Sequence, residues 1–172
     1  NTGLQRFYRD YINTGNSKEI IRNLEVAYPL WASNKLLFSA VIGEKSLELV
    51  KSDLKNKTNV LLEKNIGRSL HCIPGTNSIS FISKKKPLWE IFSIDITTLT
   101  INKTTNLDDN YEDIAWISKD VVLQAKKNQL LQFNIKTDSV WKELINKDSL
   151  QIQNISRITI SPDKTKIAIV GE

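Results

Sequence analysis

The strongest constraint in this sequence is a repeat with a period of a little over forty residues. One set of apolar residues, each followed by a polar turn, recurs at intervals of 42, 43 and 44 residues: Trp31, Ile73, Trp116 and Ile160. A second set, which precedes a different turn, recurs at intervals of 42, 42 and 39 residues: Ile12, Leu54, Ile96 and Ile135. Because two independent sets give one period, a single structural unit recurs along the chain.

The clearest copy of this unit lies at residues 157–170. Ile158 and Ile160 alternate with polar residues, which is the period-2 pattern of a strand with one buried face. The segment 161–164, Ser-Pro-Asp-Lys, supplies turn chemistry, because proline presets φ and aspartate can bond its own downstream backbone. The continuous apolar run at 167–170 predicts a strand that is buried on both faces.

The period and the strand content together predict an all-β fold. Four short strands per repeat, at a period in the low forties, are typical of a β-propeller built from four-stranded antiparallel blades. A single blade cannot bury both of its faces, so its apolar faces stack on neighbouring blades. A β-sandwich also has strands at this spacing, but it predicts no repeat at this period.

The chain is expected to be a single propeller domain, 1–172, or the C-terminal portion of one. It holds about four blade equivalents: outer strands at 1–24, blades at about 25–68, 69–110 and 111–153, and inner strands at 154–172. The two outer strands form a hairpin whose turn places Gly15 at positive φ. Pairing of the first and last segments would give a four-bladed ring. Because the sequence contains no Met, we expect instead part of a larger ring.

Two segments leave the choice between helix and strand open. Residues 46–54 carry Leu47, Val50 and Leu54 at helical spacing, but the neighbouring repeats favour a strand. A short helix is also compatible with residues 140–150.

The turn at 161–164, together with Lys166-Ile-Ala168, resembles the S-P-D-G-x-x-I-A signature of bacterial TolB-like propeller repeats. The segments 65–71 and 141–144 add to the resemblance. Lys164 stands where that family usually has glycine, so this turn must avoid positive φ or accept strain. The resemblance implies a ring of about six blades, of which this chain is part. It also implies a non-catalytic, exported propeller, periplasmic or extracellular, that serves as a docking or ligand-binding platform.

The charge balance is mildly basic, with a net charge of +5 and a pI near 9.2. The lysines are spread along the chain, which favours a solvated lysine-rich surface over nucleic-acid binding. No apolar run approaches the roughly 18 residues that a membrane helix needs. We therefore expect neither a nucleic-acid partner nor a membrane span.

No catalytic constellation is visible in the sequence. One histidine, His71, excludes a three-histidine metal site, and one cysteine, Cys72, excludes a thiolate cluster. There is no G-x-S-x-G nucleophile motif and no glycine-rich phosphate loop. We interpret His71 as structural and Cys72, in its apolar context, as a buried and inert thiol. No catalytic residue and no cofactor is predicted.

One acidic cluster is the weak candidate for a metal site. Residues 108–113 contain five carboxylate or carboxamide side chains, and a hard cation such as Ca²⁺ binds oxygen ligands. The spacing is not that of an EF-hand, so a solvated loop is the favoured interpretation. The candidate ligands are Asp108, Asp109 and Asp113.

The four tryptophans are predicted to pack in the core. Trp31 and Trp116 lie on predicted first strands of their repeats. Trp89 and Trp141 lie on outer strands, where they pack between blades or present an amphipathic edge to a partner.

These observations favour a non-catalytic propeller scaffold that binds a protein, peptide or glycan on one face. The alternative is an enzyme module, either the accessory propeller of a peptidase or a glycan-cleaving propeller. This hypothesis rests on the fold, because no ligand-binding residue is identifiable from the sequence.

Overall fold

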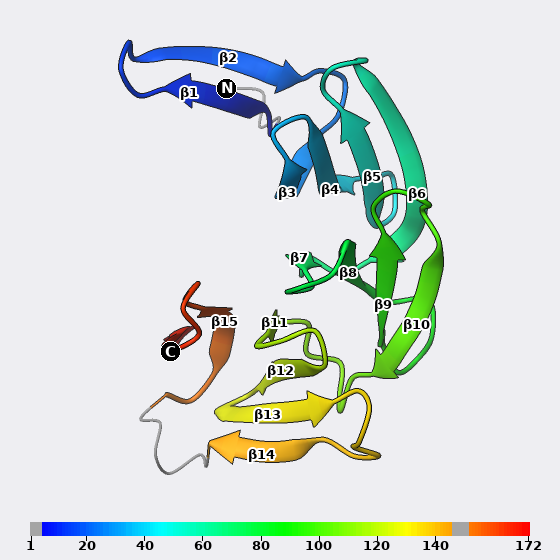
Figure 1. The fold of residues 1–172 in the computed structure, drawn as a ribbon, viewed down its shortest axis with the longest axis vertical. Coiled ribbons are helices and arrows are strands. Elements are labelled where there is room, and N and C mark those ends of the chain that lie inside the picture. The colour runs from blue at the N-terminus through cyan, green and yellow to red at the C-terminus, as the bar shows by residue number, and fades with distance from the viewer. Residues whose placement is uncertain (1–4, 146–151) are drawn as a thin grey trace. The chain divides into compact units, whose positions relative to one another are not determined.

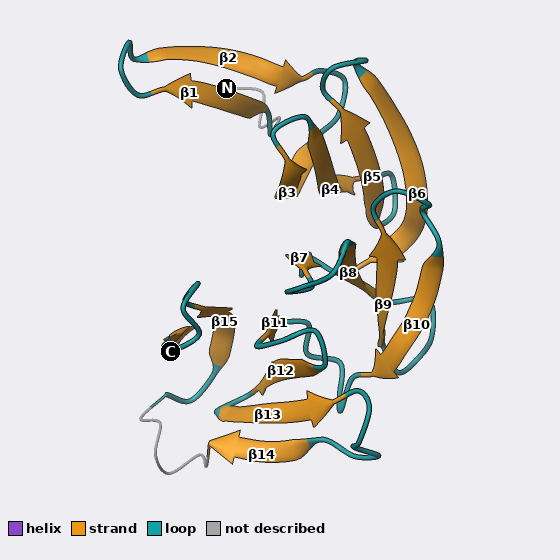
Figure 2. Cartoon of the chain, viewed as in Figure 1, coloured by secondary structure: helices purple, strands orange, loops and turns teal. Residues whose placement is uncertain are grey.

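The computed structural model describes residues 5–145 and 152–172, which form strands joined by turns and loops (Figures 1 and 2). The chain divides into two compact units, Asn1–Leu70 (unit 1) and His71–Glu172 (unit 2).

Unit 1 contains a hairpin followed by a four-stranded antiparallel sheet. The hairpin joins β1 (Phe7–Tyr11) to β2 (Asn16–Ile21), and the turn between them holds Gly15 at a φ of 68° as expected. In the sheet, each strand pairs with the next along the chain. Its strands are β3 (Val26–Ser33), β4 (Leu36–Ile42), β5 (Leu47–Asp53) and β6 (Thr58–Ile66).

Unit 2 contains two four-stranded antiparallel meanders and a final hairpin. The first meander comprises β7 (His71–Cys72), β8 (Ser78–Ser83), β9 (Glu90–Asp95) and β10 (Ile101–Asn106). The second comprises β11 (Ile114–Trp116), β12 (Val121–Lys126), β13 (Gln129–Asn134) and β14 (Lys142–Ile145). The hairpin joins β15 (Ile155–Ile160) to β16 (Ile167–Gly171).

The two sets of repeated residues mark equivalent positions in these sheets. Members of the first set lie on the first strand of a repeat, except Ile73, which directly follows β7. Members of the second set directly follow a third strand, and Ile12 follows β1 in the same way. By this criterion β1 and β2 correspond to third and fourth strands of a blade. By the same criterion β15 and β16 correspond to first and second strands.

Burial changes in the same order within each complete blade. The second strands β4, β8 and β12 are buried along most of their length, because they are paired on both edges and covered on both faces. The fourth strands β6, β10 and β14 are exposed or half-buried except at Ile66, as expected for strands at the outer edge of a blade. The prediction that residues 167–170 are buried on both faces is wrong, because Ala168 and Val170 are exposed, the latter by 59%. β16 pairs only with β15 in the described residues, so one edge and one face are uncovered.

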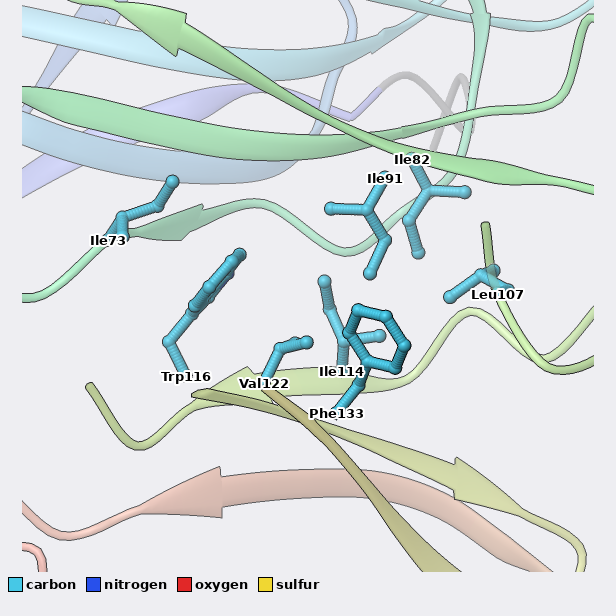
Figure 3. Close-up of a cluster of buried hydrophobic side chains, with 8 residues drawn as sticks. All are labelled: Ile73, Ile82, Ile91, Leu107, Ile114, Trp116, Val122 and Phe133. Atoms are coloured by element: carbon cyan, nitrogen blue, oxygen red, sulfur yellow. The ribbon is translucent and has the colours of Figure 1, made fainter. Parts of the chain in front are cut away.

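Separate hydrophobic clusters lie on the two faces of the β11–β14 blade. Figure 3 shows the first, in which eight side chains converge: Ile73, Ile82, Ile91, Leu107, Ile114, Trp116, Val122 and Phe133. The second joins Ala115, Leu123, Ala125 and Leu130 to Ile155 and Ile158 of β15. Adjacent residues of β11 and β12 thus point to opposite clusters, which is the alternation of a strand with two buried faces. In unit 1, Ile21 of β2 belongs to a cluster with Val26, Leu37, Val41 and Val50.

The turn after each third strand is a repeated feature that the sequence analysis did not identify. In the two blades that end this strand with aspartate, the carboxylate accepts backbone N–H groups of the turn. Asp53 accepts from Lys55 and Asn56 at 2.9 and 3.0 Å. Asp95 accepts in the same way from the two threonines that follow Ile96, at 2.9 and 2.8 Å. These hydrogen bonds lower the pKa of both carboxyl groups.

Four residues after the ends of β1, β5 and β9, the backbone turns left-handed. Gly15, Lys57 and Leu99 have φ values of 68°, 56° and 59° at this position. Only glycine adopts this conformation without a steric penalty from Cβ. The motif is therefore an acidic or polar strand end followed, four residues later, by a position that favours glycine.

The Ser-Pro-Asp-Lys turn accepts strain instead of avoiding it. Lys164 has a φ of 61°. Ser161 holds the turn closed, because its backbone N–H donates to the Lys166 carbonyl at 3.0 Å and its Oγ accepts the Lys166 N–H at 3.0 Å. Asp163 Oδ1 accepts the Thr165 N–H at 3.1 Å. Hydrogen bonds from Ser161 and Thr165 lower the pKa of the Asp163 carboxyl.

Lys164→Gly is expected to stabilise the protein by about 0.5–1 kcal/mol. Removing Cβ relieves a left-handed penalty of roughly 1–2 kcal/mol, and the greater entropy of an unfolded glycine offsets part of that gain. The urea midpoint measures the effect. Lys166→Gly is the matched control, because this neighbouring lysine is not at positive φ and should lose stability. Equal losses in both variants would show that Lys164 is not strained.

Two ambiguous segments are resolved. Residues 46–54 contain β5, so the strand interpretation is confirmed. In 140–150, the residues from Lys142 to Ile145 form the strand β14, so the short helix left open for this segment is not formed there. Pairing with β13 satisfies the backbone of this segment, and residues 146–151 lie outside the described residues.

Candidate functional site

Three connections lie at the same end of the unit 2 sheets. In an antiparallel meander, the link from the second to the third strand lies at one end of the sheet. The link from the fourth strand to the first strand of the next meander starts at the same end. In unit 2 these links are the β8–β9 connection at 84–89, the β10–β11 connection at 107–113 and the β12–β13 turn at 127–128. We call residues 84–89, 107–113 and 126–128 the loop platform, which includes Lys126 at the end of β12, and side-chain contacts show that these segments are neighbours.

A buried amide holds the longest loop of the platform. Gln124, on β12, has a fully buried side chain. Its Oε1 accepts the Asp108 N–H at 2.9 Å. Its Nε2 donates to the carbonyl oxygens of Asp109 and Tyr111, each at 2.9 Å. One side chain therefore satisfies three backbone groups of the loop, which fixes its path.

Asn110 ties this loop to the β8–β9 connection. Its Oδ1 accepts the Trp89 N–H at 3.0 Å, and its Nδ2 donates to the Pro87 carbonyl at 2.8 Å. The Leu107 N–H donates to the Trp89 carbonyl at 3.0 Å. The two connections thus form one hydrogen-bonded surface.

Ion pairs across the platform join lysines to acids from neighbouring segments. Lys84 Nζ lies 2.9 Å from Glu112 and 4.0 Å from the centre of the Trp89 ring. Lys126 Nζ lies 2.7 Å from Asp108 and 3.7 Å from Asp109. The hydrogen bond from Asp108 raises the pKa of the Lys126 ammonium group. Each of these side chains is partly exposed, so the ion pairs contribute little to stability. Their main effect is to orient the charged side chains on the surface.

A second set of charges surrounds Glu90 at the start of β9. The side chain of Glu90 is buried, and it contacts the ammonium groups of Lys103 at 2.6 Å and Lys86 at 3.0 Å. The hydrogen bond from Lys103 is the main cause of the lowered pKa of Glu90. Lys86 is thereby held at the edge of the platform.

The acidic side chains considered as metal ligands point to cations of the protein. Asp108 and Asp109 share Lys126, and Asp113 lies 3.5 Å from the Arg157 guanidinium. Within residues 5–145 and 152–172, no group of three acidic, histidine or cysteine side chains is arranged to hold a metal ion. The charges of this loop are arranged in pairs with basic groups, which is the arrangement of an ordered surface loop.

His71 and Cys72 form the short strand β7, away from the platform loops in the sequence. The prediction that Cys72 is buried is wrong, because its side chain is exposed. On a two-residue strand, consecutive side chains point to opposite faces, so the apolar neighbour Ile73 is no guide to the burial of Cys72. Partial burial still raises the pKa of the thiol. His71 is half-buried, and burial lowers its pKa to about 4.

The shift at His71 predicts a pH dependence of stability. Its folded pKa of about 4 lies below the unfolded value of about 6.5. The stabilisation is therefore complete above about pH 6.5 and is lost as the pH falls toward 4, because the unfolded chain takes up the proton first. We expect a loss of about 2–3 kcal/mol across this window. Urea unfolding of the wild type and of His71→Gln at several pH values measures it. Identical slopes in both proteins would contradict this role of His71.

The tryptophans divide into buried and exposed positions. Trp116 is 6% exposed, as predicted, and Trp89 and Trp141 are half-buried against the cluster of Figure 3. The prediction that Trp31 packs in the core is wrong, because its side chain is 41% exposed. Trp31 contacts Phe7 at a ring distance of 6.1 Å and Arg9 at 5.5 Å, both on β1. Among the described residues, the sheet that contains β1 has only β1 and β2, and much of the indole stays exposed.

Unit 1 has an open hollow at the equivalent second-to-third connection. It lies between the β4–β5 link at 43–46 and the end of β6. Glu48 and Lys64 line it and form an ion pair of 3.3 Å. Lys64 is more exposed than Lys84 and Lys126 of the loop platform, and the lining residues include no buried polar anchor like Gln124.

No helix in the described part of the chain is long and apolar enough to cross a membrane. No protein-family model matches the sequence, and no curated protein matches it.

Solved structures match the fold. TolB from Acinetobacter baumannii matches with a TM-score of 0.70 at 18% identity, over 92% of this chain and 41% of that chain. The nidogen/laminin complex matches with a TM-score of 0.61 at 10% identity, over 96% of this chain and 64% of that chain. The chain thus spans less than two thirds of either matched chain. These likenesses concern the fold alone, and they confirm that the chain folds as four-stranded antiparallel blades of the β-propeller type.

Proposed function

We propose that this chain is a non-catalytic β-propeller scaffold that binds a protein partner through the loop platform of unit 2. The observation that carries the proposal is the anchoring of residues 107–113 by the buried amide of Gln124. A loop that is already fixed loses little conformational entropy when a partner binds. Connections at the edge of a rigid sheet that are held in this way are typical of binding surfaces.

The chemistry of the platform suits a protein interface. Leu88 is 41% exposed and lies in the β8–β9 connection, next to Trp89. Around it stand oriented charges of both signs, among them Lys86, Asp109 and Glu112. An apolar centre with a polar rim is the usual anatomy of a protein–protein interface.

A protein partner is favoured over a glycan, because the face of the Trp89 ring is covered. A sugar ring stacks on an open aromatic face, whereas the face of Trp89 is covered by the Lys84 ammonium group at 4.0 Å. The nidogen structure, which is a complex with laminin, supports the same class of partner by analogy of fold. The exported location implied by the resemblance to TolB-like repeats belongs to this proposal.

Site-specific photo-crosslinking tests the proposal. A photoreactive amino acid replaces Leu88 in one protein and Val60 in another, and both are exposed to extracts of the source cells. Val60 is the matched control, because it is 47% exposed on β6 and lies outside the platform. We expect a discrete crosslinked partner from position 88 and none from position 60.

Quantitative binding then tests the same surface with the purified partner. Leu88→Asp is expected to weaken binding at least tenfold, whereas Val60→Asp leaves it unchanged. Equal capture from both positions, or binding that is insensitive to Leu88→Asp, would place the partner elsewhere and refute the platform.

A further inference from the structure

One carboxylate, that of Glu90 at the start of β9, holds two ammonium groups. The Glu90 side chain is 4% exposed, and its Oε1 lies 2.6 Å from Lys103 Nζ and 3.0 Å from Lys86 Nζ. Lys103 lies on β10, the strand that pairs with β9, and Lys86 lies in the β8–β9 connection (Figure 1). Because a buried carboxylate is costly without close cationic partners, Glu90 fixes where the two ammonium groups lie.

The charges of this group do not balance. Two ammonium groups and one carboxylate leave a surplus of one positive charge. Glu90 keeps its negative charge, because the hydrogen bond from Lys103 lowers its pKa. The side chains of Lys86 and Lys103 are 65% and 44% exposed, so solvent reaches both. Each ammonium group has three N–H donors, so the contact with Glu90 leaves donors for a second anion.

The other acids of the loop platform do not neutralise this surplus. Among residues 5–145 and 152–172, the ion pairs of Lys86 and Lys103 are those with Glu90. The carboxylates of the 107–113 connection contact other cations. These pairs are Asp108 and Asp109 with Lys126, Glu112 with Lys84, and Asp113 with Arg157. The surplus charge is therefore open to an anion from outside the described part of the chain.

The surplus charge lies beside the apolar centre of the loop platform. Leu88 stands two residues from both Lys86 and Glu90, and the ion pair joins these two residues. The exposed Leu88 side chain is thus carried by a short loop whose ends are held together. Two residues span at most about 7 Å, so one short segment of a partner can contact both Leu88 and the ammonium groups.

We propose that Lys86 and Lys103 form a carboxylate-binding site, in which the partner of the loop platform places an Asp or Glu side chain beside the apolar group that packs on Leu88. This inference rests on the proposed function, because it assigns the chemistry of the partner at the same surface. A carboxylate carries the single negative charge that matches the surplus, whereas a phosphate dianion exceeds it.

The buried carboxylate gives this site its binding advantage. A free lysine side chain loses rotamer entropy when it is ordered by a ligand. Here Glu90 has already ordered both lysines, so less entropy is lost when an external carboxylate binds. Charge complementarity of this kind mainly determines which partner is selected, so the site selects an acidic segment.

Disulfide trapping on the purified full chain tests the site without a known partner. Leu88→Cys is combined with Cys72→Ser, so that position 88 carries the reactive thiol. The probes are acetylated and amidated pentapeptides, X-Gly-Cys-Gly-X, in which X is Glu, Gln or Lys. The concentration of reductant that releases half of each probe measures its non-covalent retention. We expect release of the Glu probe to need about threefold more reductant than release of the Gln probe, with the Lys probe released first.

Lys86→Gln in this background removes the surplus charge. Glu90 keeps its nearer partner, Lys103, so the fold is expected to be retained. We then expect the Glu and Gln probes to be released at the same reductant concentration. Lys136→Gln is the matched control, because Lys136 is also 65% exposed and paired with one carboxylate, that of Asp120, but lies outside the loop platform. The preference for Glu should be unchanged in this variant.

Equal retention of the Glu and Gln probes without the Lys86 substitution, or a preference for Glu that survives Lys86→Gln, would overturn the carboxylate site. A fourth probe with phosphoserine in place of Glu distinguishes the source of the anion. If this probe is retained more tightly than the Glu probe, the site is one for phosphate and the charge match is wrong.

The partner captured by photo-crosslinking separates this inference from the proposed function. If binding of that partner depends on Leu88 but not on Lys86, the loop platform stands and the carboxylate site fails. If the preference for Glu is observed but no partner is captured, the proposed function fails while the carboxylate site stands.

Discussion

Trp116→Ala is expected to lower the free energy of unfolding by about 3–5 kcal/mol, the range for a buried aromatic side chain. Trp116 is 6% exposed and packs among the side chains of the cluster in Figure 3. Its indole N–H also donates to the Ser80 hydroxyl at 2.8 Å, which links β11 of one blade to β8 of another. Urea unfolding at neutral pH measures the loss. Trp116→Phe is expected to cost about 1–2 kcal/mol, because it keeps much of the packing and leaves the buried Ser80 hydroxyl without its donor.

The matched control is Trp31→Ala, at the same position of another repeat. Because Trp31 is 41% exposed, its loss should be less than half that of Trp116. A loss under about 1 kcal/mol for Trp116→Ala, or equal losses at the two positions, would contradict the register of the blades.

Gln124→Leu is expected to cost about 2–4 kcal/mol. The volume of the side chain is nearly unchanged, but the Asp108 N–H and the carbonyl oxygens of Asp109 and Tyr111 lose their partner. Each buried polar group left unpaired costs about 1–3 kcal/mol, and water entry into the released loop recovers part of the total. Urea unfolding gives the cost, and amide hydrogen exchange at 108–113 should become faster.

Gln132→Leu is the control for this variant. Gln132 is half-buried on β13, the strand that pairs with β12, and its substitution should change stability by less than about 0.5 kcal/mol. If Gln124→Leu lowers stability no more than Gln132→Leu does, or if hydrogen exchange at 108–113 is unchanged, the loop platform is not anchored as described.

The repeat was predictable because it depends on local chemistry. The residues of the second set directly follow third strands, where a polar turn begins. Ile12, Leu54, Ile96 and Ile135 therefore keep one place in the fold. The strand pairing followed from this regularity. The burial of each side chain could not be predicted in this way, because it depends on the neighbouring sheet. Trp31 and Trp116 have the same place in the repeat. Trp116 is buried and contacts Ser80 on β8, the second strand of the neighbouring blade, whereas Trp31 is 41% exposed.

The acidic loop could be found in the sequence, but not its partners. Lys126 and Arg157 approach Asp108 and Asp113 from strands that are distant along the chain. The role of Gln124 was missed, although a signal was present. It stands inside the apolar run at 121–125, and a polar residue on a buried strand needs hydrogen-bond partners. What those partners are follows only from the path of the loop.

Hydrogen exchange along the whole chain is the most direct test of the blade architecture. In each complete blade, the second strand should be more protected than the fourth, because the second is buried and paired on both edges, whereas the fourth is exposed or half-buried along most of its length. The account predicts slow exchange in β4, β8 and β12, and exchange at least about tenfold faster in β6, β10 and β14. Uniform protection from exchange across these strands would contradict it. Slower exchange in a fourth strand than in the second strand of the same sheet would also contradict it.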